Sequence, residues 1–202
     1  MKMKGTGNLI YLVCDWLMRL AILNVLWITF TLMGGGVFGI FPASAACVAL
    51  LKEWIADRRP HPVAFYWNIY KRSFLSANVM FLCTFVLMIL LGFNIYTSLQ
   101  FTGVWFYIFF SGTVFLAGGV LMTAILTFNP LSHGMKAKEA LRNALHLLLL
   151  YPGRLLSFIA GFALLLVCIR FIPGILPLYS VNIILLLTVL LFPFQQEAQK
   201  PV

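Results

Sequence analysis

Residues 71–100 read KRSFLSANVMFLCTFVLMILLGFNIYTSLQ, in which two cations precede an apolar run over 74–99. About 20 apolar residues in a helix cross a hydrocarbon core of roughly 30 Å, so this stretch predicts a membrane span from about Phe74 to Thr97. The whole chain has this character, since 62% of its 202 residues are hydrophobic and 9% are charged. Soluble domains carry about 25% charged residues, which excludes that class. Further apolar runs lie at 20–33, 37–51, 104–128, 155–172 and 175–194.

The positive charges segregate when six spans are drawn through these runs. Of the 14 Lys and Arg residues, only Arg170 lies near one side, and the other thirteen fall on the opposite side. Loops rich in Lys and Arg stay in the cytoplasm, so both termini are expected there. The expected fold is an all-α polytopic bundle of six transmembrane helices in one domain, residues 1–202. The thirteen cations are Lys2, Lys4, Arg19, Lys52, Arg58, Arg59, Lys71, Arg72, Lys136, Lys138, Arg142, Arg154 and Lys200.

The second span is the least regular of the six. It follows Gly34-Gly35-Gly36, and its run over 37–51 is short for a crossing, so it is alternatively one leg of a re-entrant hairpin. With five spans the segregation weakens to ten cations against four, and six spans are therefore favoured. The four are Lys2, Lys4, Arg19 and Arg170.

One tripeptide in this region looks like a signal-peptidase site. Ala43-Ser44-Ala45 has the small residues that cleavage requires, but a signal peptide carries its apolar region of about 7–15 residues much nearer the start. Asp15 and Arg19 also interrupt the approach. No cleavage is expected here.

Two basic amphipathic segments are expected on the cytoplasmic side. The first, residues 57–73, is a loop ending in a turn of helix whose aromatic and basic side chains suit the membrane interface. The second is a helix over 133–150, capped by Ser132 after Asn129-Pro130 stops the fourth span. Its expected apolar stripe is Ala137, Ala140, Leu141, Ala144, Leu145 and Leu148, and its polar face is Lys136, Glu139, Arg142, Asn143 and His146. The expected lipid-interface anchors are Arg58, Arg59, Lys71, Arg72 and Arg154.

Residues suited to catalysis or metal binding are sparse. The chain has five acidic residues, three histidines and four cysteines, with no His-x-x-x-His or Cys-x-x-Cys spacing. We therefore expect no enzymatic activity, no cofactor and no metal, and the cysteines are expected to be small buried hydrophobes. The net charge of +9 borders apolar runs, so the expected partner of these charges is the lipid bilayer and not nucleic acid.

The first helix, expected from about Asn8 to Met33, carries polar residues that are expected to lie inside the bundle. Asp15 and Arg19 are four residues apart on one face and are able to pair. Asn24 is able to hydrogen-bond a neighbouring helix, which is worth roughly 0.6–2 kcal/mol, and this role is favoured over a substrate contact. The candidate interior polar cluster is Asp15, Arg19, Asn24 and Trp27.

The helix at 133–150 also has a short likeness to permease subunits of ATP-driven importers. Those subunits dock their ATPase through a cytoplasmic helix containing Glu-Ala-Ala, followed by Gly. This chain has Glu139-Ala140-Leu141, but Leu145 stands where the glycine would be. An interfacial helix is therefore the default, with Glu139, Arg142 and His146 as its candidate partner face.

The chain resembles the YesL-like family of bacterial integral membrane proteins, a domain of unknown function. The likeness lies in Leu23-Asn24-Val25-Leu26-Trp27, Pro42-Ala43-Ser44-Ala45-Ala46, the run from Phe65 to Phe74, and residues 138–144. The family's turn after the first helix is usually richer in Thr than Gly34-Gly35-Gly36 and Pro42. The resemblance implies a Gram-positive-type cytoplasmic membrane protein, often encoded near genes for carbohydrate uptake or polysaccharide degradation, and it supplies no catalytic residues.

Two classes of function follow. The favoured one is a non-enzymatic membrane accessory protein that binds a transporter or sensor subunit, linked to sugar uptake or its sensing. The alternative is a small-solute carrier that works as a homo-oligomer, since six helices make half of a larger pathway. A cavity lined by Asn24, Asn78 or Asn94 would favour the carrier, and an exposed apolar face along 133–150 would favour partner binding.

Overall fold

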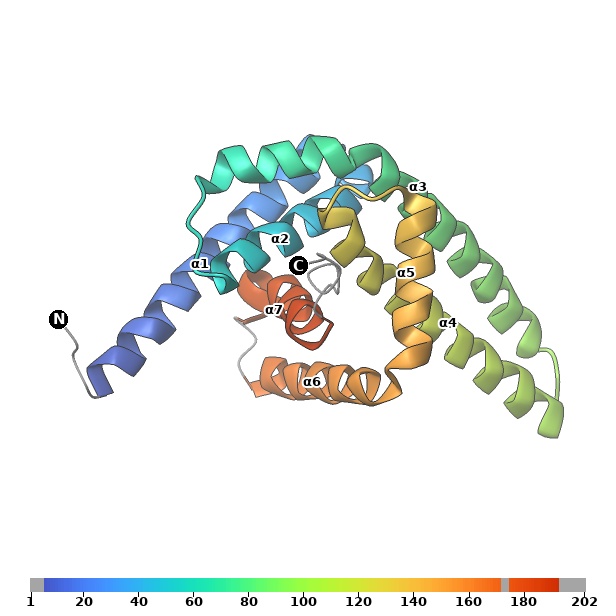
Figure 1. Ribbon diagram of the computed structural model, residues 1–202. Helices are drawn as coiled ribbons and strands as arrows, with labels where there is room; N and C mark the ends of the chain where they lie inside the picture. The colour runs from blue at the N-terminus through green and yellow to red at the C-terminus, as the bar shows by residue number, and fades with distance from the viewer. Residues whose placement is uncertain (1–5, 172–174, 193–202) are drawn as a thin grey trace.

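The computed structural model describes residues 6–171 and 175–192, where every regular element is a helix, as expected (Figure 1). Side chains are described for residues 11–167, 170–171 and 181–192, so those of Lys2, Lys4, Cys168 and Lys200 lie outside this part. The elements are α1 (Thr6–Met33), the 3-10 turn η1 (Val37–Gly39), α2 (Ile40–Ile55), α3 (Pro62–Ser98), α4 (Val104–Ser132), α5 (Ala137–Leu150), α6 (Pro152–Phe171) and α7 (Ile175–Leu191).

Four helical segments among the described residues are long and apolar enough to cross a membrane. They are Tyr11–Met33 of α1, Val37–Ile55 of η1 and α2, α3 and α4. A fifth follows if α5 and α6, which are bent by 93°, form one broken span, and α7 has a shorter apolar stretch over Val181–Leu191. The all-α membrane-type fold is confirmed, and the count of six crossings with both termini inside stays a prediction.

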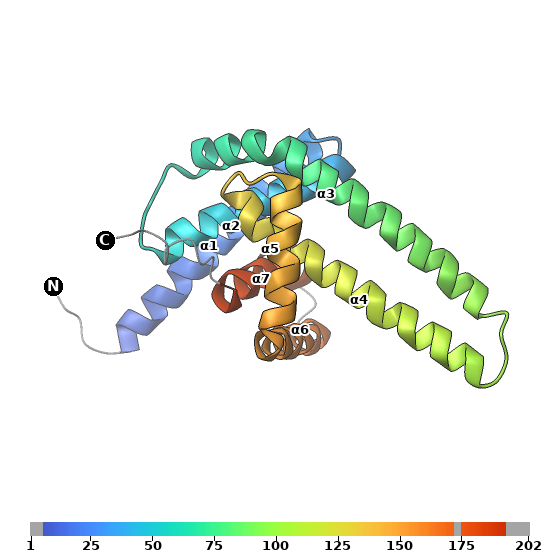
Figure 2. The same ribbon diagram turned by 45° about the vertical axis from the view of Figure 1, so that its right-hand side comes forward.

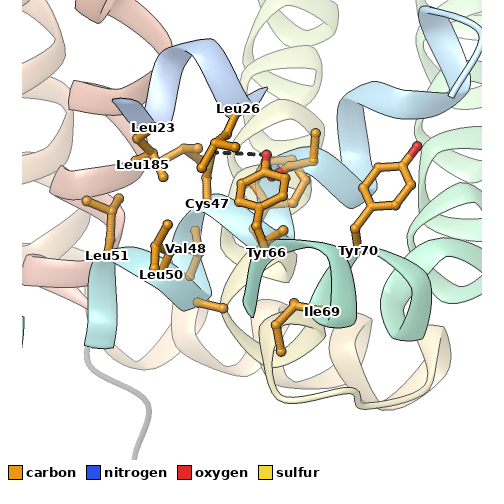
Figure 3. Packing of buried hydrophobic residues seen from close by; sticks show 14 of the residues in the cluster. Leu23, Leu26, Cys47, Val48, Leu50, Leu51, Tyr66, Ile69, Tyr70 and Leu185 are labelled. Carbon is orange, nitrogen blue, oxygen red and sulfur yellow. Dashed lines mark hydrogen bonds between the residues drawn. The ribbon is translucent and has the colours of Figure 1, made fainter. Parts of the chain in front are cut away.

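α2 lies at the centre of the described structure and packs against α1, α3, α4 and α7. Every residue from Pro42 to Leu51 is buried, and four of them are alanines, which allow neighbouring helices to approach closely. Figure 3 shows the surrounding core. It includes Leu23 and Leu26 of α1, Tyr66, Ile69 and Tyr70 of α3, and Leu185 of α7.

α3 is one helix of 37 residues that begins at Pro62, so the helix expected at the end of the 57–73 segment is confirmed, but it is longer than expected and continuous with the next span. Pro62 starts the helix, because its fixed φ suits the first helical position, where no backbone N–H is needed. The aromatic rings of the first turns enter the core instead of lying along the membrane interface. The ring centroids of Tyr66 and Tyr70 lie 4.7 and 5.3 Å from that of Phe30. Their burial between α1 and α2 outweighs an interfacial position, since buried aromatic pairs add specific ring contacts to the area that they bury.

α4 continues through Asn129-Pro130 to Ser132, so the expected stop at this dipeptide is wrong. A proline this close to the end of a helix disturbs only its last turn, which limits the cost. Ser132 does not cap the next helix, because its hydroxyl donates to the Asn129 carbonyl oxygen at 2.5 Å. α5 begins instead at Ala137, after Lys136 in an extended conformation.

The buried face of α5 is rotated from the expected apolar stripe. Ala140, Ala144 and Leu147 are buried, whereas Leu145 is exposed. These buried positions follow one another by four and then three residues, which places them in one seam along the helix. The seam faces α4 and α3, and Ala144 and Leu147 also share a core cluster with Phe158 of α6. The position of these helices decides which apolar residues of α5 are buried.

The far halves of α3 and α4 form a hairpin that projects from the core, as both views show (Figures 1 and 2). Its outer side chains are widely exposed, by 66% at Phe93 and 81% at Phe115. Between the two helices, the Thr113 hydroxyl donates to Asn94 Oδ1 at 2.8 Å, so this polar pair is satisfied inside the hairpin. Soluble proteins rarely expose apolar surface on this scale, and lipid is the solvent that suits it.

The glycine turn, defined as residues 34–39 between α1 and α2, packs against α3. A Cβ atom on Gly34 would lie 2.5 Å from the Tyr70 hydroxyl oxygen and 2.5 Å from the Gly39 Cα, so neither glycine position has room for a larger residue. Gly36 also has a φ of 75°, which favours glycine. The six-span threading places this turn and the basic pair after Tyr70 on opposite sides of the membrane, yet the structure holds them together.

Replacing Gly39 by alanine should destabilise the protein. The new Cβ would overlap the Thr31 carbonyl oxygen, and backbone on both sides leaves little room to adjust. Forced overpacking costs about 1–3 kcal/mol, so the melting temperature in mild detergent should fall. Gly118→Ala is the control, because nothing lies within 4 Å of its Cβ position and alanine favours a helix. Equal melting of G39A and wild type would contradict this packing.

Candidate functional site

The predicted polar cluster of α1 divides into two sites. At the first, Arg19 pairs with Asp15 at 2.7 Å, as their spacing predicted. The Arg19 guanidinium also lies 5.4 Å from the ring centroid of Trp16 and 6.0 Å from that of Trp54, close to the end of α2. This ion pair is therefore stabilised by aromatic rings on two helices.

The second site joins α1 to the start of α2. Trp27 Nε1 donates to Ser44 Oγ at 3.1 Å, and Ser44 donates to its own helix at Ile40 O, 2.8 Å away. Asn24 is buried one turn before Trp27. Asp15 and Trp27 are twelve residues apart, about 18 Å along a helix, so these four residues cannot act as a single cluster.

A buried junction on α2 and α7 escaped the sequence analysis. Asn182 Nδ2 donates to the Leu20 carbonyl oxygen at 3.0 Å, and the Cys47 thiol faces Asn182 Oδ1 at 4.0 Å. The same sulfur lies 3.5 Å from the hydroxyl oxygen of Tyr66, a contact drawn as a dashed line in Figure 3, and that hydroxyl donates to Ala43 O at 2.8 Å. The asparagine within an apolar run was visible in the sequence. Its partners, up to 162 residues away, had no local signal.

Lys52 links the end of α2 to the end of α4. Its Nζ donates to Ser132 Oγ at 3.0 Å, to His133 Nε2 at 2.9 Å and to the side-chain oxygen of Asn129. Asn129 donates in turn through Nδ2 to the Phe192 carbonyl oxygen after α7. A cation at the carbonyl end of a helix is favoured by the helix dipole. We call Lys52, Arg72, Asn129, Ser132 and His133 the polar junction.

Arg72 enters the same junction from α3. Its Nη2 donates to the Ser132 carbonyl oxygen at 3.0 Å, and a Cβ atom on Gly134 would lie 2.7 Å from its Nε. Gly134 has a φ of 78°, so glycine is suited to this close passage of the chain. Two cations from separate helices thus meet at one serine. The sequence had given Lys52 only a topological role and Arg72 only a lipid-anchoring one.

His133, just beyond α4, serves the junction as a neutral acceptor. Partial burial, together with the positive charges of Lys52 and Arg72, lowers the pKa of His133 to about 4, and burial contributes most. An imidazole that accepts from a lysine ammonium at Nε2 has its own proton on Nδ1. Protonation of His133 would remove this acceptor and place a third cation in the junction.

The other predicted lipid anchors lie at the surface with local contacts. Arg58 pairs with Glu53 at 2.6 Å. Lys71 lies 4.5 Å from the ring centroid of Trp67, and Arg154 lies 4.3 Å from that of Tyr151. Arg59 is exposed. A cation over an aromatic ring suits the boundary between lipid and water, where both groups find favourable surroundings.

The predicted partner residues all lie on the outer side of α5. Glu139, Arg142 and His146 are exposed, and Leu145 and Leu149 are exposed beside them, the latter by 79%. We call these five residues the α5 face. Its opposite side is fixed to α4 and α3 by the buried seam, so a rigid helix presents charged and apolar groups together.

The three asparagines that a carrier was expected to use do not converge. Asn24 is buried in the core beside α2, and Asn94 accepts from Thr113 in the projecting hairpin. Asn78 donates to Phe74 O of its own helix at 2.9 Å. They therefore do not line a common pathway.

Comparison with known proteins places the chain among relatives from one bacterium. The sequence profile of a family described as a protein of unknown function, DUF624, matches residues 20–95, which include α2 and its contacts with α1 and α3. The uncharacterized protein YteU of Bacillus subtilis (strain 168) is 31% identical over 176 residues, covering 85% of this chain and 78% of YteU.

Two further uncharacterized proteins of Bacillus subtilis (strain 168) are similar. YesV is 27% identical over 174 residues, covering 85% of this chain and 83% of YesV. YesL is 40% identical over 68 residues, covering 33% of this chain and 32% of YesL. No solved structure gives a significant match.

Substitution of Asn129 by leucine should destabilise the polar junction. The leucine side chain removes an acceptor from Lys52 and a donor from the Phe192 carbonyl, and leaving buried polar groups without partners costs about 1–3 kcal/mol. The melting temperature in mild detergent should fall. The control is Asn68→Leu at an exposed position of α3, which should melt like the wild type. A stable N129L variant would show that the junction does not hold the helices.

Stability should depend on His133 in acid. Its pKa lies below the value of 6.5 that it has when unfolded, so the unfolded chain takes up the proton first as the pH falls. This contribution is complete above pH 6.5 and is lost as the pH falls through about 4. The melting temperature of His133→Gln, which keeps an acceptor, should fall less than that of the wild type across this window.

His146→Gln is the matched control for that experiment, because His146 is exposed on α5 and contacts no member of the polar junction. Its melting temperature should follow the wild type through the same pH range. If H133Q and the wild type lose stability equally, His133 is not the neutral partner of Lys52.

Proposed function

This chain belongs to the YesL-like family of proteins of unknown function, DUF624, and on that premise we propose that it is a non-enzymatic accessory protein of the bacterial cell membrane. Its role is to bind a membrane transporter or sensor subunit. The observation that carries the proposal is the α5 face, where charged and apolar side chains are exposed together on a helix that the rest of the fold fixes in place.

The composition of the α5 face suits a protein partner better than lipid alone. Glu139 is an acid among cations, and an acid gains nothing from an anionic lipid surface. Leu145 and Leu149 lie beside it and add apolar area. Protein interfaces combine an apolar centre with a polar rim, and these five residues supply both on one side of a helix.

The placement of the titratable groups supports a role without catalysis. Asp15 and Glu53 pair with arginines, and Lys52 and His133 hydrogen-bond within the polar junction. These groups are engaged in local ion pairs or in the contact between α2 and α4, which leaves the exposed charges on α5 for recognition. A carrier is the second class considered. It is disfavoured because Asn24, Asn78 and Asn94 lie apart and do not line a common pathway.

The proposal needs α5 on the cytoplasmic side of the cell membrane. Lys136, Lys138 and Arg142 lie in or just before this helix, and such clusters are retained in the cytoplasm. This holds in the threading with six crossings and both termini inside, and it holds equally if α2 is re-entrant. The link to sugar uptake or its sensing comes from the family resemblance and forms part of the proposal.

The experiment is a pull-down of the tagged protein from its native membrane in mild detergent, followed by identification of the co-purifying proteins. Glu139→Gln combined with Arg142→Gln should leave expression and membrane insertion unchanged. Recovery of the partner should fall at least about fivefold, which corresponds to about 1 kcal/mol of binding free energy.

The control is Glu53→Gln combined with Arg58→Gln, which also removes one acid and one cation, from the exposed ion pair at the end of α2. It should retain the partner. Equal recovery with E139Q/R142Q and wild type would show that the α5 face is not the interface. Purification of the wild type as a homo-oligomer without other subunits would overturn the accessory role and favour the carrier.

A further inference from the structure

We propose that α2 does not cross the membrane but forms a re-entrant leg, with the glycine turn on the cytoplasmic face beside the basic loops. In this arrangement α1 approaches the cytoplasm at Met33, α2 dips into the membrane, and residues 56–61 return the chain to the same face at the start of α3. The α5 face lies on the cytoplasmic side in this and in the six-span threading, so this inference is independent of the proposed partner.

The first argument is the angle at which α2 meets α4. The ring centroid of Phe41, near the start of α2, lies 5.1 Å from that of Phe128, and Lys52, near the end of α2, bonds to Ser132 at 3.0 Å. On α2 the two contacts are eleven residues apart, which is about 16 Å along the helix axis. On α4 the same two contacts are only four residues apart, which is about 6 Å along that helix. α2 therefore passes obliquely over the last turns of α4 and does not run beside it across the bilayer.

The second argument is that the glycine turn and the α4–α5 loop are held by neighbouring residues of α3. Gly34 packs against the hydroxyl of Tyr70, while Arg72 bonds to Ser132 and passes close to Gly134. Tyr70 and Arg72 are about 3 Å apart along a helix. The six-span threading requires a hydrocarbon core of roughly 30 Å between the turn and this loop, which these contacts cannot bridge.

The third argument is the arrangement of the whole fold. In Figures 1 and 2, the end of α1, the first half of α3 and the α4–α5 loop lie along the upper edge. The start of α1 and the tip of the α3–α4 hairpin lie at the lower edge in both views. The turn on the upper edge therefore lies away from the hairpin tip, although the six-span threading places both outside the cell.

Charge identifies the upper edge as cytoplasmic. Lys71 and Arg72 lie in the first half of α3, and Lys136 and Lys138 lie at the α4–α5 loop and the start of α5. Loops with this density of cations stay inside. The five-span threading puts ten cations on the cytoplasmic side and four on the outer side. This segregation is weaker than that of the six-span threading, but it is the one compatible with the contacts. It places the start of α1 on the outer face.

The surroundings of α2 suit a re-entrant leg. Segments that enter and leave by one face are tolerated where protein encloses them, and α2 is buried by α1, α3, α4 and α7. Its polar residues have partners there, as Ser44 does in Trp27 and Lys52 does in the polar junction. Residues 56–61, which carry Asp57, Arg58 and Arg59, stay near the cytoplasmic face, because Lys52 just before them bonds to the end of α4. Six residues span at most about 20 Å, which is enough to reach the start of α3.

The test is the side from which introduced cysteines react with a membrane-impermeant maleimide, in a chain whose four native cysteines are replaced by alanine. Val37→Cys and Phe38→Cys report on the glycine turn, where both side chains are more than half exposed, at 53% and 55%. Lys136→Cys marks the cytoplasmic loop, and Gln100→Cys marks the tip of the hairpin. Each variant is first checked for wild-type expression and a single gel-filtration peak.

We expect V37C and F38C to behave like K136C, with at least a tenfold increase in labelling when the cells are opened. Q100C should react fully in intact cells. Labelling of V37C and F38C in intact cells to the same extent as Q100C would overturn the inference and restore the six-span threading.

Discussion

Because α2 is enclosed by α1, α3, α4 and α7, the polar groups on its enclosed faces have to find partners on those helices. Ser44 meets Trp27, Cys47 faces Tyr66 and Asn182, and Lys52 bonds to the end of α4. A buried polar group without a partner costs more than its hydrogen bond contributes, so these contacts fix how the helices are arranged. The rest of the fold is positioned by this requirement.

The polar junction shows how one such requirement joins distant parts of the chain. Lys52 and Arg72 come from different helices and both bond to Ser132. The cations compensate the exposed carbonyl groups at the end of α4, where the helix dipole favours positive charge. Burial, together with the same two charges, lowers the pKa of His133 and keeps it neutral, so that it accepts from Lys52.

The two outer parts of the molecule obey a different constraint. The α3–α4 hairpin exposes large apolar side chains and keeps its polar pair, Asn94 and Thr113, between the helices. α5 buries a narrow seam of small residues and leaves charges outside. One surface suits lipid and the other suits water or a partner, and both are carried by α3 and α4, on which α5 packs directly.

The class of fold, most of the helical segments and the ion pair between Asp15 and Arg19 were all predictable from the amino-acid sequence. These features are local, since apolar length, charge placement and spacing within one helix are read from neighbouring residues. The sequence also identified Glu139, Arg142 and His146 as one polar face of a helix, which the structure places at the surface.

Which apolar run lies at the centre and which polar residues meet depend on tertiary packing and were not predictable from the sequence. Pro130 looked like a helix end, and residues 57–73 looked like an interfacial loop, because both patterns are typical of those features when considered alone. Packing against α2 overrode them, since the burial of Tyr66 and Tyr70 against Phe30 depends on residues more than 30 positions away. The partners of Lys52 and Asn182 lie 77 to 162 residues distant, and no local pattern encodes such a contact.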